Sequence, residues 1–381
     1  MQTCTLKLAV LTNFVPPYRV SLFEALRKRC ADMRIFISTP METNRPWEAD
    51  PHGLPVVLQK SWTLRTTRWR YAEYHEVSHL HLPLDTIAQL SRYRPDAVLS
   101  GELGFRTLAA WIYSRMHRHI AYVPWLDLAM YTEQDVGRLR TRFRKLLLSG
   151  ARAIVTNGVS GSQYACALGA PKHLLFESPF TVPAEEFSSA PVPRPAHLAK
   201  KLLYAGQFIE RKGLLPFLEA LRRYCLQHPE QSVQFRLVGS GPLRPALEAY
   251  AAPANLHLEI ADWLPYSQLV EEYAGAGIFV LPTFSDTWGM VVSEAMASGI
   301  PVLGSECAQA VEQLVQEGVN GWRFHPADPS SVQSAIERAL SAPVERLAQM
   351  QEAARRTLRE VTVDKSADIM IQALLQASGR C

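Results

Sequence analysis

The sequence predicts an α/β protein made of two doubly wound parallel sheets, each in its own domain. Short apolar runs alternate with longer helical segments, and this pattern occurs once in each half of the chain. A proline-rich stretch separates the halves, and 381 residues are too many for one ordinary core. Near-continuous apolar strands separated by helices indicate parallel sheets covered on both faces.

Each half supplies its own set of elements. In the first half we expect strands at 7–12, 33–38, 96–100, 120–123 and 153–156, with helices at 20–29 and 107–117. In the second half we expect strands at 202–205, 233–238, 257–260, 277–281 and 302–304, with helices at 214–225, 243–251 and 330–340. The sequence thus divides into an N-terminal domain at 1–180, a linker at 181–195 and a C-terminal domain at 196–356. Ligands of such sheets bind beyond the carboxyl ends of the strands, so we expect a site in a cleft between the domains.

Composition excludes several classes of protein. Apolar residues make up 48% and charged residues 20%, which is typical of a folded globular chain rather than a disordered one. Lys7 interrupts the first apolar run, so we expect no cleavable signal, and no run approaches the roughly 20 residues of a membrane span. The six cysteines are scattered without a C-x-x-C pair, which favours a reducing cytoplasm over a disulfide framework.

The net charge of +4 conceals an asymmetry between the halves. Residues 1–180 carry 23 Lys/Arg and 14 Asp/Glu, a balance of +9, whereas residues 181–381 carry 17 and 22, a balance of −5. A basic half beside an acidic half suggests that one face meets an anionic partner. An ordinary solvated surface is the alternative.

The stretch from Phe284 to Pro301 follows an expected strand and contains two acids, Asp286 and Glu294. A helix is expected from about Met290, with Gly299 suited to its C-terminal cap. The amides near Trp288, Gly289 and Met290 would then be free helix N-terminal donors, which form an anion site. The two acids can accept hydrogen bonds from hydroxyls on either side, an arrangement that suits a sugar–diphosphate–ribose ligand. The alternative is a capped surface helix with two solvated acids.

Two further strand ends carry similar turns. Arg211 and Lys212 follow the strand at 202–205 and precede a helix, where two cations suit a pyrophosphate. Gly239 and Gly241 follow the strand at 233–238, but without the third glycine of a dinucleotide fingerprint. Taken alone, each has a plain structural alternative, an ordinary basic turn or an ordinary glycine turn.

Together the three motifs resemble the family 4 retaining glycosyltransferases of the GT-B fold. The family signature is two acids separated by seven residues, followed by an Ala-Met-Ala-x-Gly-x-Pro tail; Asp286, Glu294 and the segment 295–301 match it. Lys212-Gly213 and the glycine turn at 239–242 match the family in order and spacing, and 319–328 resembles its later Asn-Gly strand. The match is specific over about 200–330 and looser before it, where 15–26 resembles the first loop and helix of many members.

The resemblance implies a nucleotide-sugar donor bound by the C-terminal domain and an acceptor bound by the N-terminal domain. Glu294 would hold the ribose, Asp286 the sugar hydroxyls, and Arg211 and Lys212 the diphosphate together with the helix amides. It further implies that no metal or other cofactor is needed, and that the segment 357–377 packs back on the N-terminal domain. The remaining donor-binding residues that it implies are Arg19, Gly206, Gln207, Gly239, Gly241, Trp288, Gly289 and Met290.

The sequence departs from the family at two positions. Gln207 stands where many members have an arginine, and Arg211 is expected to substitute for it. The segment 121–128 lacks the histidine that faces the donor sugar in many members, so Asp127 or Glu102 is expected to face the cleft instead. Asp286 keeps the charge of the family's first acid with a shorter reach, so it should change which sugar hydroxyl is held.

Two other motifs have competing interpretations. The segment 75–79 matches H-E-x-x-H, but His81-Leu-Pro83 follows at once and a strand is the better interpretation than a zinc helix. The segment 138–148 is an amphipathic helix rich in arginine, which either docks on its own sheet or attaches to anionic lipid. A nucleic-acid partner is not expected, because the basic residues lack interleaved aromatics.

The resulting prediction is a glycosyltransferase of the hexosyltransferase type, located in the cytoplasm or peripherally on the inner face of a membrane. It would transfer a sugar from a nucleotide-diphosphate sugar to a hydroxyl of a glycan, a lipid-linked glycan or another cell-surface glycoconjugate precursor, as in polysaccharide biosynthesis. Two alternatives stay open: a sugar-nucleotide epimerase of the same fold, and a binding protein that kept the donor pocket without catalysis.

Overall fold

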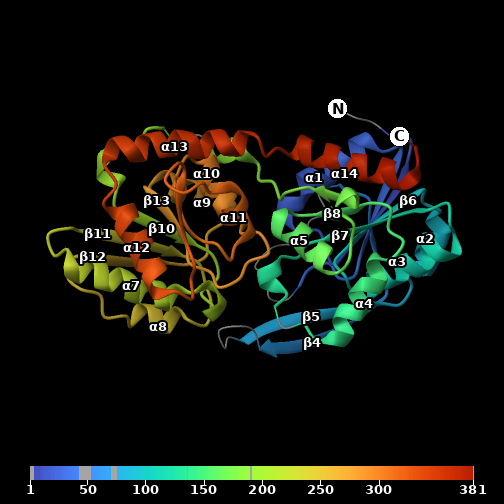
Figure 1. Ribbon diagram of the computed structural model, residues 1–381, viewed down its shortest axis with the longest axis horizontal. Coiled ribbons are helices and arrows are strands. Elements are labelled where there is room, and N and C mark those ends of the chain that lie inside the picture. The colour runs from blue at the N-terminus through green and yellow to red at the C-terminus, as the bar shows by residue number, and fades with distance from the viewer. Residues whose placement is uncertain (1–3, 43–52, 70–74, 135, 189–190, 381) are drawn as a thin grey trace. The chain divides into compact units, whose positions relative to one another are not determined.

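The computed structural model describes residues 4–42, 53–69, 75–134, 136–188 and 191–380 (Figure 1). These residues form two compact units. Unit 1 consists of the described residues up to Thr181, apart from His75, and is completed by those from Thr362 onward. Unit 2 runs from Val182 to Val361 and also takes in His75. Each unit is built around one sheet whose strands are all parallel.

The sheet of unit 1 has the strand order β3-β2-β1-β6-β7-β8-β9. Its direction of winding reverses between β1 and β6, which is where open α/β sheets bind ligands. A separate two-stranded sheet, β4 (Ser61–Trp69) and β5 (His75–Pro83), belongs to the same half of the chain. The strands of the main sheet are β1 (Lys7–Thr12), β2 (Asp32–Ile37), β3 (Val56–Leu58), β6 (Ala97–Gly101), β7 (Ala121–Leu126), β8 (Ile154–Thr156) and β9 (Leu175–Glu177).

Helices cover both faces of this sheet because its strands are apolar on both sides. In β1, Leu8 and Val10 pack into one core cluster with α1 (Val20–Arg29) and α14 (Val363–Ser378). Ala9 and Leu11 point to the other cluster. The helices of that second face are α2 (Thr86–Tyr93), α3 (Phe105–Met116), α4 (Arg138–Leu148) and α5 (Val159–Ala167).

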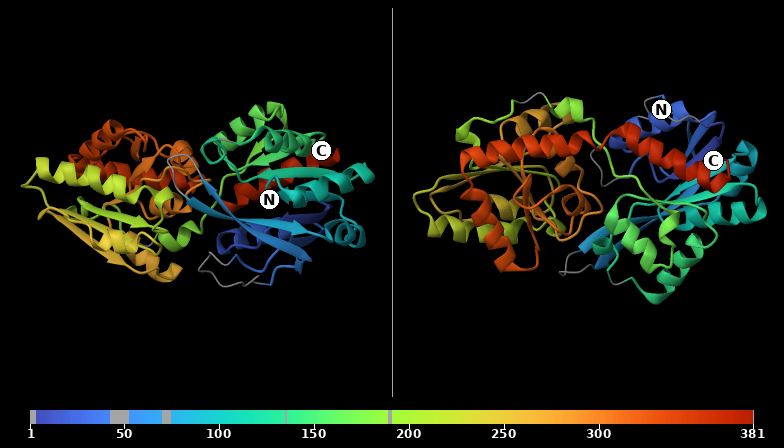
Figure 2. Two further views of the ribbon diagram at one scale, coloured as in Figure 1. Left: turned by 90° about the horizontal axis from the view of Figure 1, so that it is seen from below. Right: turned by 45° about the horizontal axis from the view of Figure 1, so that its top comes forward.

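The sheet of unit 2 has the order β12-β11-β10-β13-β14-β15 and reverses between β10 and β13. Its strands are β10 (Lys201–Ala205), β11 (Val233–Val238), β12 (Leu256–Ala261), β13 (Ile278–Leu281), β14 (Val302–Ser305) and β15 (Gly321–Phe324). Helices α7 (Leu214–Gln227), α8 (Arg244–Glu248) and α12 (Pro329–Leu340) lie on one side of it in Figure 1. On the other side lie α9 (Tyr266–Ala274), α10 (Met290–Ala297) and α13 (Val344–Arg359), and Figure 2 shows the same layers from two further directions.

All ten strands expected from the sequence are present, with ends displaced by three residues at most. The helix expected at 243–251 is shorter, since α8 ends at Glu248 and the chain then tightens into turns toward Pro253. The H-E-x-x-H segment lies in β5, which confirms the strand interpretation. The H-E-x-x-H zinc motif needs its two histidines one turn apart on a helix. In an extended strand they are spread along the chain and cannot bind one zinc ion in that way.

The proline-rich segment and the C-terminal segment both pack more closely than a flexible connection would. Within the expected linker 181–195, the short helix α6 (Ala184–Phe187) buries Phe187 against the rings of Tyr266 and Tyr273. In the segment 357–377, residues up to Val361 belong to unit 2, and α14 then packs on α1 within unit 1. The buried guanidinium of Arg29 fixes α14 by pairing with Asp364 and Asp368, at 2.7 Å each.

Two arginines close the C-terminal end of α10. Arg194 is buried, and its guanidinium donates to Ser298 O at 2.8 Å and to Ala274 O, the last residue of α9. Arg355 donates to Ser298 O as well, at 3.0 Å. Carbonyls at helix C-termini carry partial negative charge, so these cations stabilise the ends of both helices. Burial lowers the pKa of Arg194 to about 10, which leaves it charged at neutral pH.

We expect Arg194→Met to destabilise unit 2 by about 2–3 kcal/mol, because it leaves the Ala274 carbonyl without this donor and the Ser298 carbonyl with Arg355 alone. Urea unfolding measures this loss. Arg222→Met is the matched control: Arg222 is exposed and pairs with exposed Glu219, so it should cost about 0.5 kcal/mol or less. Equal unfolding midpoints for the two variants would contradict the role given to Arg194.

Candidate functional site

The three turns singled out in the sequence meet at one edge of the unit 2 sheet. They follow β11, β10 and β13, which are neighbours in the sheet, and the edge is formed by the carboxyl ends of these parallel strands. The reversal between β10 and β13 falls inside this group. The topology therefore supplies the ligand-binding position of an open α/β sheet.

Two cations hold the first of the two predicted acids. Lys212 Nζ contacts Asp286 Oδ2, and Arg211 Nη1 lies 3.8 Å from Asp286 Oδ1 while donating to Ser285 O at 2.5 Å. These side chains are mostly buried, with 12–17% of each exposed. Backbone hydrogen bonds fix the same two turns, since Phe284 N donates to Arg211 O at 2.9 Å. Asp286 thus belongs to a charge cluster and is not a solvated surface acid.

Helix α10 begins at Met290, as the sequence predicts. Gly289 caps it with φ +94°, a left-handed conformation that a residue with a side chain rarely adopts. Within the described residues, the amides of Gly289, Met290 and Val291 donate to no backbone carbonyl, so this end keeps the partial positive charge of a helix N-terminus. The Trp288 side chain is buried and its indole donates to Ser293 Oγ at 3.3 Å.

The second acid, Glu294, is buried in α10 with 7% of its surface exposed. The hydroxyl of Tyr273 donates to its Oε2 at 2.7 Å and, among the described residues, is its one hydrogen-bond donor. Burial raises the pKa of Glu294 to about 7, and the bond from Tyr273 opposes that rise. The alternative of two solvated acids on a capped surface helix is therefore wrong for both carboxylates.

The glycine turn after β11 packs against the turn after β10. Phe208 N donates to Ser240 O at 2.8 Å, and Gly206 N donates to Val238 O at 2.9 Å. A Cβ on Gly239 would collide with the carbonyl oxygen of Gly206, so this close approach requires glycine. Gln207 lies beside these turns and is partly exposed, and Gly241 completes the turn.

The loop after β14, which the sequence analysis did not single out, completes this edge. Asp286 N donates to Cys307 O at 2.9 Å, and the buried Gln309 amide donates to Thr287 O at 2.8 Å. Ala310 N donates to Trp288 O at 2.9 Å. Cys307 in this loop and the first residues of α11 (Gln309–Leu314) thereby fix the backbone that carries Asp286 into α10. The polar Gln309 just beyond an apolar strand is the sequence signal that was missed.

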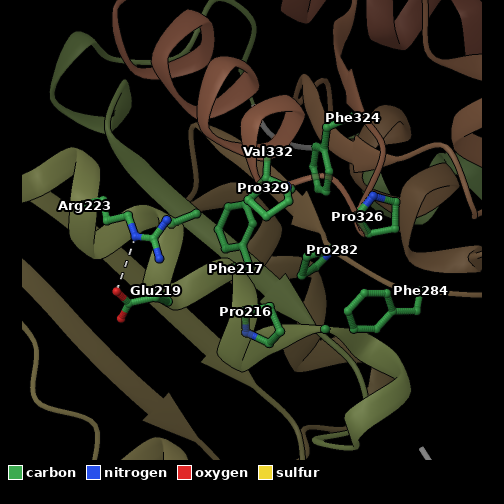
Figure 3. A pocket seen from close by; sticks show the side chains of 12 residues that line it. Pro216, Phe217, Glu219, Arg223, Pro282, Phe284, Phe324, Pro326, Pro329 and Val332 are labelled. Carbon is green, nitrogen blue, oxygen red and sulfur yellow. Dashed lines mark ion pairs between the residues drawn. The ribbon is translucent and has the colours of Figure 1, made fainter. Parts of the chain in front are cut away.

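A pocket of about 220 Å³ lies behind the Lys212–Gly213 turn (Figure 3). Figure 3 shows Phe217, Phe284 and Phe324 around it, and Glu219 and Arg223 form an ion pair at 3.5 Å. Most of its lining is proline and phenylalanine, so it offers few partners to phosphates or hydroxyls. The remaining lining residues are Gly213, Pro216, Ala220, Pro282, Pro326, Pro329 and Val332.

In unit 1, Arg19 and Asp127 form a pair at the carboxyl end of β7. Arg19 contacts Asp127 Oδ2 directly, and 7% and 14% of the two side chains are exposed. The Arg19 guanidinium also lies over the ring of Trp125, 4.2 Å from its centre. Arg19 Nε and Asp127 Oδ1 are buried without a partner among the described residues.

Glu102 lies at the end of the neighbouring strand β6 in a left-handed conformation, with φ +63°. Asn13 Nδ2 donates to its Oε1 at 2.6 Å, and Arg106 lies 3.7 Å from its Oε2. About 47% of its side chain is exposed, three times the value for Asp127. Desolvation by the surrounding protein raises the pKa of Glu102 although its side chain is half-exposed, while Arg106 and Asn13 oppose that rise. Asn13, directly after β1, and Arg106, one helical turn after Glu102, were not singled out in the sequence.

The predicted site residues thus form two groups. Arg211, Lys212, Asp286, Glu294 and the three turns gather in unit 2, whereas Arg19, Asp127 and Glu102 lie at the reversal of the unit 1 sheet. No cluster of three or more His, Cys, Asp or Glu side chains that could hold a metal occurs among the residues that the structure describes.

These features define the fold as GT-B, two doubly wound domains on one chain. The chain superposes on Anabaena HepE, solved in complex with UDP and glucose, with a TM-score of 0.70 and 13% identity over 97% of this chain and 99% of that one. It superposes on the apo form of the lipopolysaccharide outer core galactosyltransferase WaaB with a TM-score of 0.72 and 13% identity over 97% and 99%. At such identities the likeness establishes the fold.

The family match lies within unit 2. Residues 199–342 match the family model described as glycosyl transferases group 1. The sulfoquinovosyl transferase of Arabidopsis thaliana is 26% identical over 281 residues, which cover 67% of this chain and 52% of that protein. An uncharacterized glycosyltransferase of Methanocaldococcus jannaschii is 28% identical over 144 residues, covering 37% of this chain and 36% of its own length. The matched stretches thus span about a third to a half of these relatives.

None of the helices in the described part of the chain is both long enough and apolar enough to cross a membrane.

We predict that Glu294 makes the stability of unit 2 depend on pH. Between about pH 4.5 and pH 7 the folded state keeps a proton that the unfolded state has released, so the free energy of unfolding falls as the pH rises. Glu294→Gln cannot titrate, so its free energy of unfolding does not fall in this way. Relative to wild type, the free energy of unfolding of this variant should rise by up to about 3 kcal/mol between pH 4.5 and pH 8.

Urea unfolding at both pH values measures the difference. Glu271→Gln is the control, because Glu271 is exposed on α9 and should leave the pH dependence of wild type unchanged. A stability difference between wild type and Glu294→Gln that does not vary with pH would show that the buried carboxyl is ionised throughout.

Proposed function

We propose that this protein is a retaining glycosyltransferase that moves a hexose from a nucleotide-diphosphate sugar to a hydroxyl group of an acceptor. The observation that carries the proposal is the meeting of two cations, a helix N-terminus and two carboxylates at one edge of the unit 2 sheet. The match to glycosyl transferases group 1 and the fold shared with a protein solved with UDP and glucose support it.

Each group at that edge suits one part of a nucleotide sugar. The amides that open α10 and the cations of Arg211 and Lys212 suit the diphosphate, because both supply positive charge to phosphate oxygens. Glu294 suits the ribose, since an ionised carboxylate accepts two hydroxyl hydrogen bonds and one of its oxygens is already oriented by Tyr273. Asp286, placed between cations and ahead of the helix, suits the hydroxyls of the transferred sugar.

The same charges favour departure of the nucleotide. When the bond between the sugar and the diphosphate breaks, negative charge grows on the leaving phosphate, and fixed cations nearby stabilise it without reorganising. Two cations and a helix end can do this without a metal, so we propose that none is required. Retention would follow if the acceptor attacks from the face of the departing phosphate, which then takes the acceptor proton.

We propose that the acceptor binds at the reversal of the unit 1 sheet. Glu102 is favoured there over Asp127 as the group that contacts an acceptor hydroxyl, because more of its side chain is exposed and Asn13 fixes its orientation. Asp127 would instead orient Arg19, with which it is paired. Glu102 has a strained left-handed backbone conformation, and such strain is typical of residues in functional sites.

A thermal-shift screen with UDP-, GDP- and ADP-sugars tests the donor proposal. We expect one class of donor to raise the unfolding midpoint, since a ligand at 100 times its Kd stabilises by about 2.7 kcal/mol. Glu294→Ala should lose most of that rise, whereas Glu271→Ala, on the exposed face of α9, should keep it. A wild type that no donor stabilises, or a Glu294→Ala variant stabilised as much as wild type, would contradict the proposal.

Radiolabelled donor then separates the three possible activities. A transferase moves the label to an extracted glycan or lipid pool, an epimerase changes the sugar while it stays on the nucleotide, and a binding protein does neither. Only the first result supports the proposed function.

We further propose that the acceptor is lipid-linked and that α4 contacts an anionic membrane surface. Leu147 and Leu148 dock α4 on its own sheet, so the packing interpretation of this helix holds for its inner face. The outer face carries the exposed cations Arg138, Arg142 and Lys145 together with Leu139 and Leu146, which are 82% and 43% exposed. Exposed leucines flanked by cations are typical of helices that lie on anionic lipid.

Co-sedimentation with phosphatidylglycerol vesicles at low salt tests this surface. Replacing Arg138, Arg142 and Lys145 together by Gln should weaken binding by about two orders of magnitude, at roughly 1 kcal/mol for each cation. Replacing the exposed Arg223, Arg356 and Arg359 of unit 2 by Gln removes the same charge elsewhere and should have little effect. Equal losses in both variants would mean that net charge, not α4, governs binding, and no binding by wild type would exclude the surface.

A further inference from the structure

Two thiols of unit 1 lie in contact although they are 26 positions apart in the chain. Cys4 precedes β1, Cys30 is the C-cap of α1, and their Sγ atoms are 3.8 Å apart. Both thiols are free. Closing this gap to the roughly 2.05 Å of a disulfide therefore requires only a small movement of the two side chains.

The backbone on both sides of the pair is already fixed in register. Cys4 N donates to Arg29 O at 2.7 Å, and Ala31 N donates to Leu6 O at 3.1 Å. Arg29 is anchored in turn by its pairs with Asp364 and Asp368 of α14. Because the segments around the two cysteines are hydrogen-bonded together, the thiols meet in the folded protein at a high effective concentration.

The two thiols differ in pKa and in solvent exposure. The contact between the two Sγ atoms lowers the pKa of Cys4, against the effect of burial, and the charge of Arg380 contributes to the lowering. The same contact raises the pKa of Cys30, which keeps its proton. Cys4 is buried, whereas Cys30 is partly exposed and opens the pair to solvent. In contrast, burial raises the pKa of both Cys225 and Cys307 to about 11, which makes them poor nucleophiles.

We propose that Cys4 and Cys30 form a reversible dithiol–disulfide site that hydroperoxides oxidise. The Cys4 thiolate attacks the terminal peroxide oxygen, the O–O bond breaks, and the departing oxygen takes up a proton to leave as an alcohol or water. Cys4 is then a sulfenic acid. The Cys30 sulfur attacks the Cys4 sulfur, the S–O bond breaks, and the hydroxyl leaves as water with the proton that Cys30 releases. Two thiols are oxidised by two electrons, and one peroxide is reduced.

This site is independent of the proposed transfer reaction. The cysteines lie at the amino end of β1, whereas Asn13 and Glu102 lie at the carboxyl ends of β1 and β6. Oxidation closes a covalent loop of 26 residues that includes α1 and so restricts the unfolded chain. We therefore expect it to raise the stability of unit 1 without blocking the carboxyl edge.

The test uses the full-length protein, reduced with dithiothreitol, desalted and treated with equimolar hydrogen peroxide. Alkylation followed by tryptic mass mapping should find the peptides of Cys4 and Cys30 joined, with Cys166, Cys225 and Cys307 alkylated. The oxidised protein should have a thermal midpoint several degrees higher than the reduced protein, and dithiothreitol should reverse both changes.

Variants distinguish the pair from general thiol oxidation. Cys4→Ser and Cys30→Ser should each abolish the joined peptide and the rise in midpoint, whereas Cys166→Ser, at a partly exposed cysteine outside the pair, should retain both. The proposal is overturned if peroxide leaves Cys4 and Cys30 open to alkylation, converts Cys4 to sulfinic acid without a joined peptide, or links other cysteines instead. Mapping of the wild-type protein decides this even if a variant fails to fold.

Discussion

The parallel pairing of β10 with β13 is the constraint on which the candidate site of unit 2 depends. The two strands are separated by more than 70 residues, and their pairing makes the turns that follow them neighbours at one edge. Lys212 then reaches Asp286, and the chain beyond Asp286 enters α10 in a fixed direction. Every other contact at this edge, including the glycine turn after β11 and the loop after β14, adds to a geometry that this pairing establishes.

The fold was predictable because each strand identifies itself locally. A buried parallel strand is apolar on both faces, so runs such as Ile278–Leu281 and Leu8–Leu11 stand out without any knowledge of their partners. Elements whose residues are polar or short gave no such signal. The strand β4 is mostly polar, and β3 and β9 have three residues each. The packing of the 181–195 segment depends on distant partners, such as the carbonyls that Arg194 reaches, and no local pattern reports them.

The site was predictable in its residues more than in its contacts. Glu294, Lys212 and Asp286 are marked by their positions after strands or inside a helix, which sequence spacing conveys. That Tyr273 orients Glu294, or that Gln309 holds the loop before α10, follows from side chains that come together across the fold. The burial of Glu294 was likewise invisible, because hydropathy treats every glutamate as a solvated residue.

The return of α14 to unit 1 means that the first unit to be synthesised is the last to be finished. The sheet of unit 1 is complete once β9 has been made, yet the apolar side chains of α1 that pack against Met370, Ile371 and Leu374 lack their cover until the whole of unit 2 has followed. At ordinary rates of translation this interval is roughly 10–40 s. A growing chain therefore carries an open apolar surface for all of that time, which is a condition that favours aggregation before synthesis is complete.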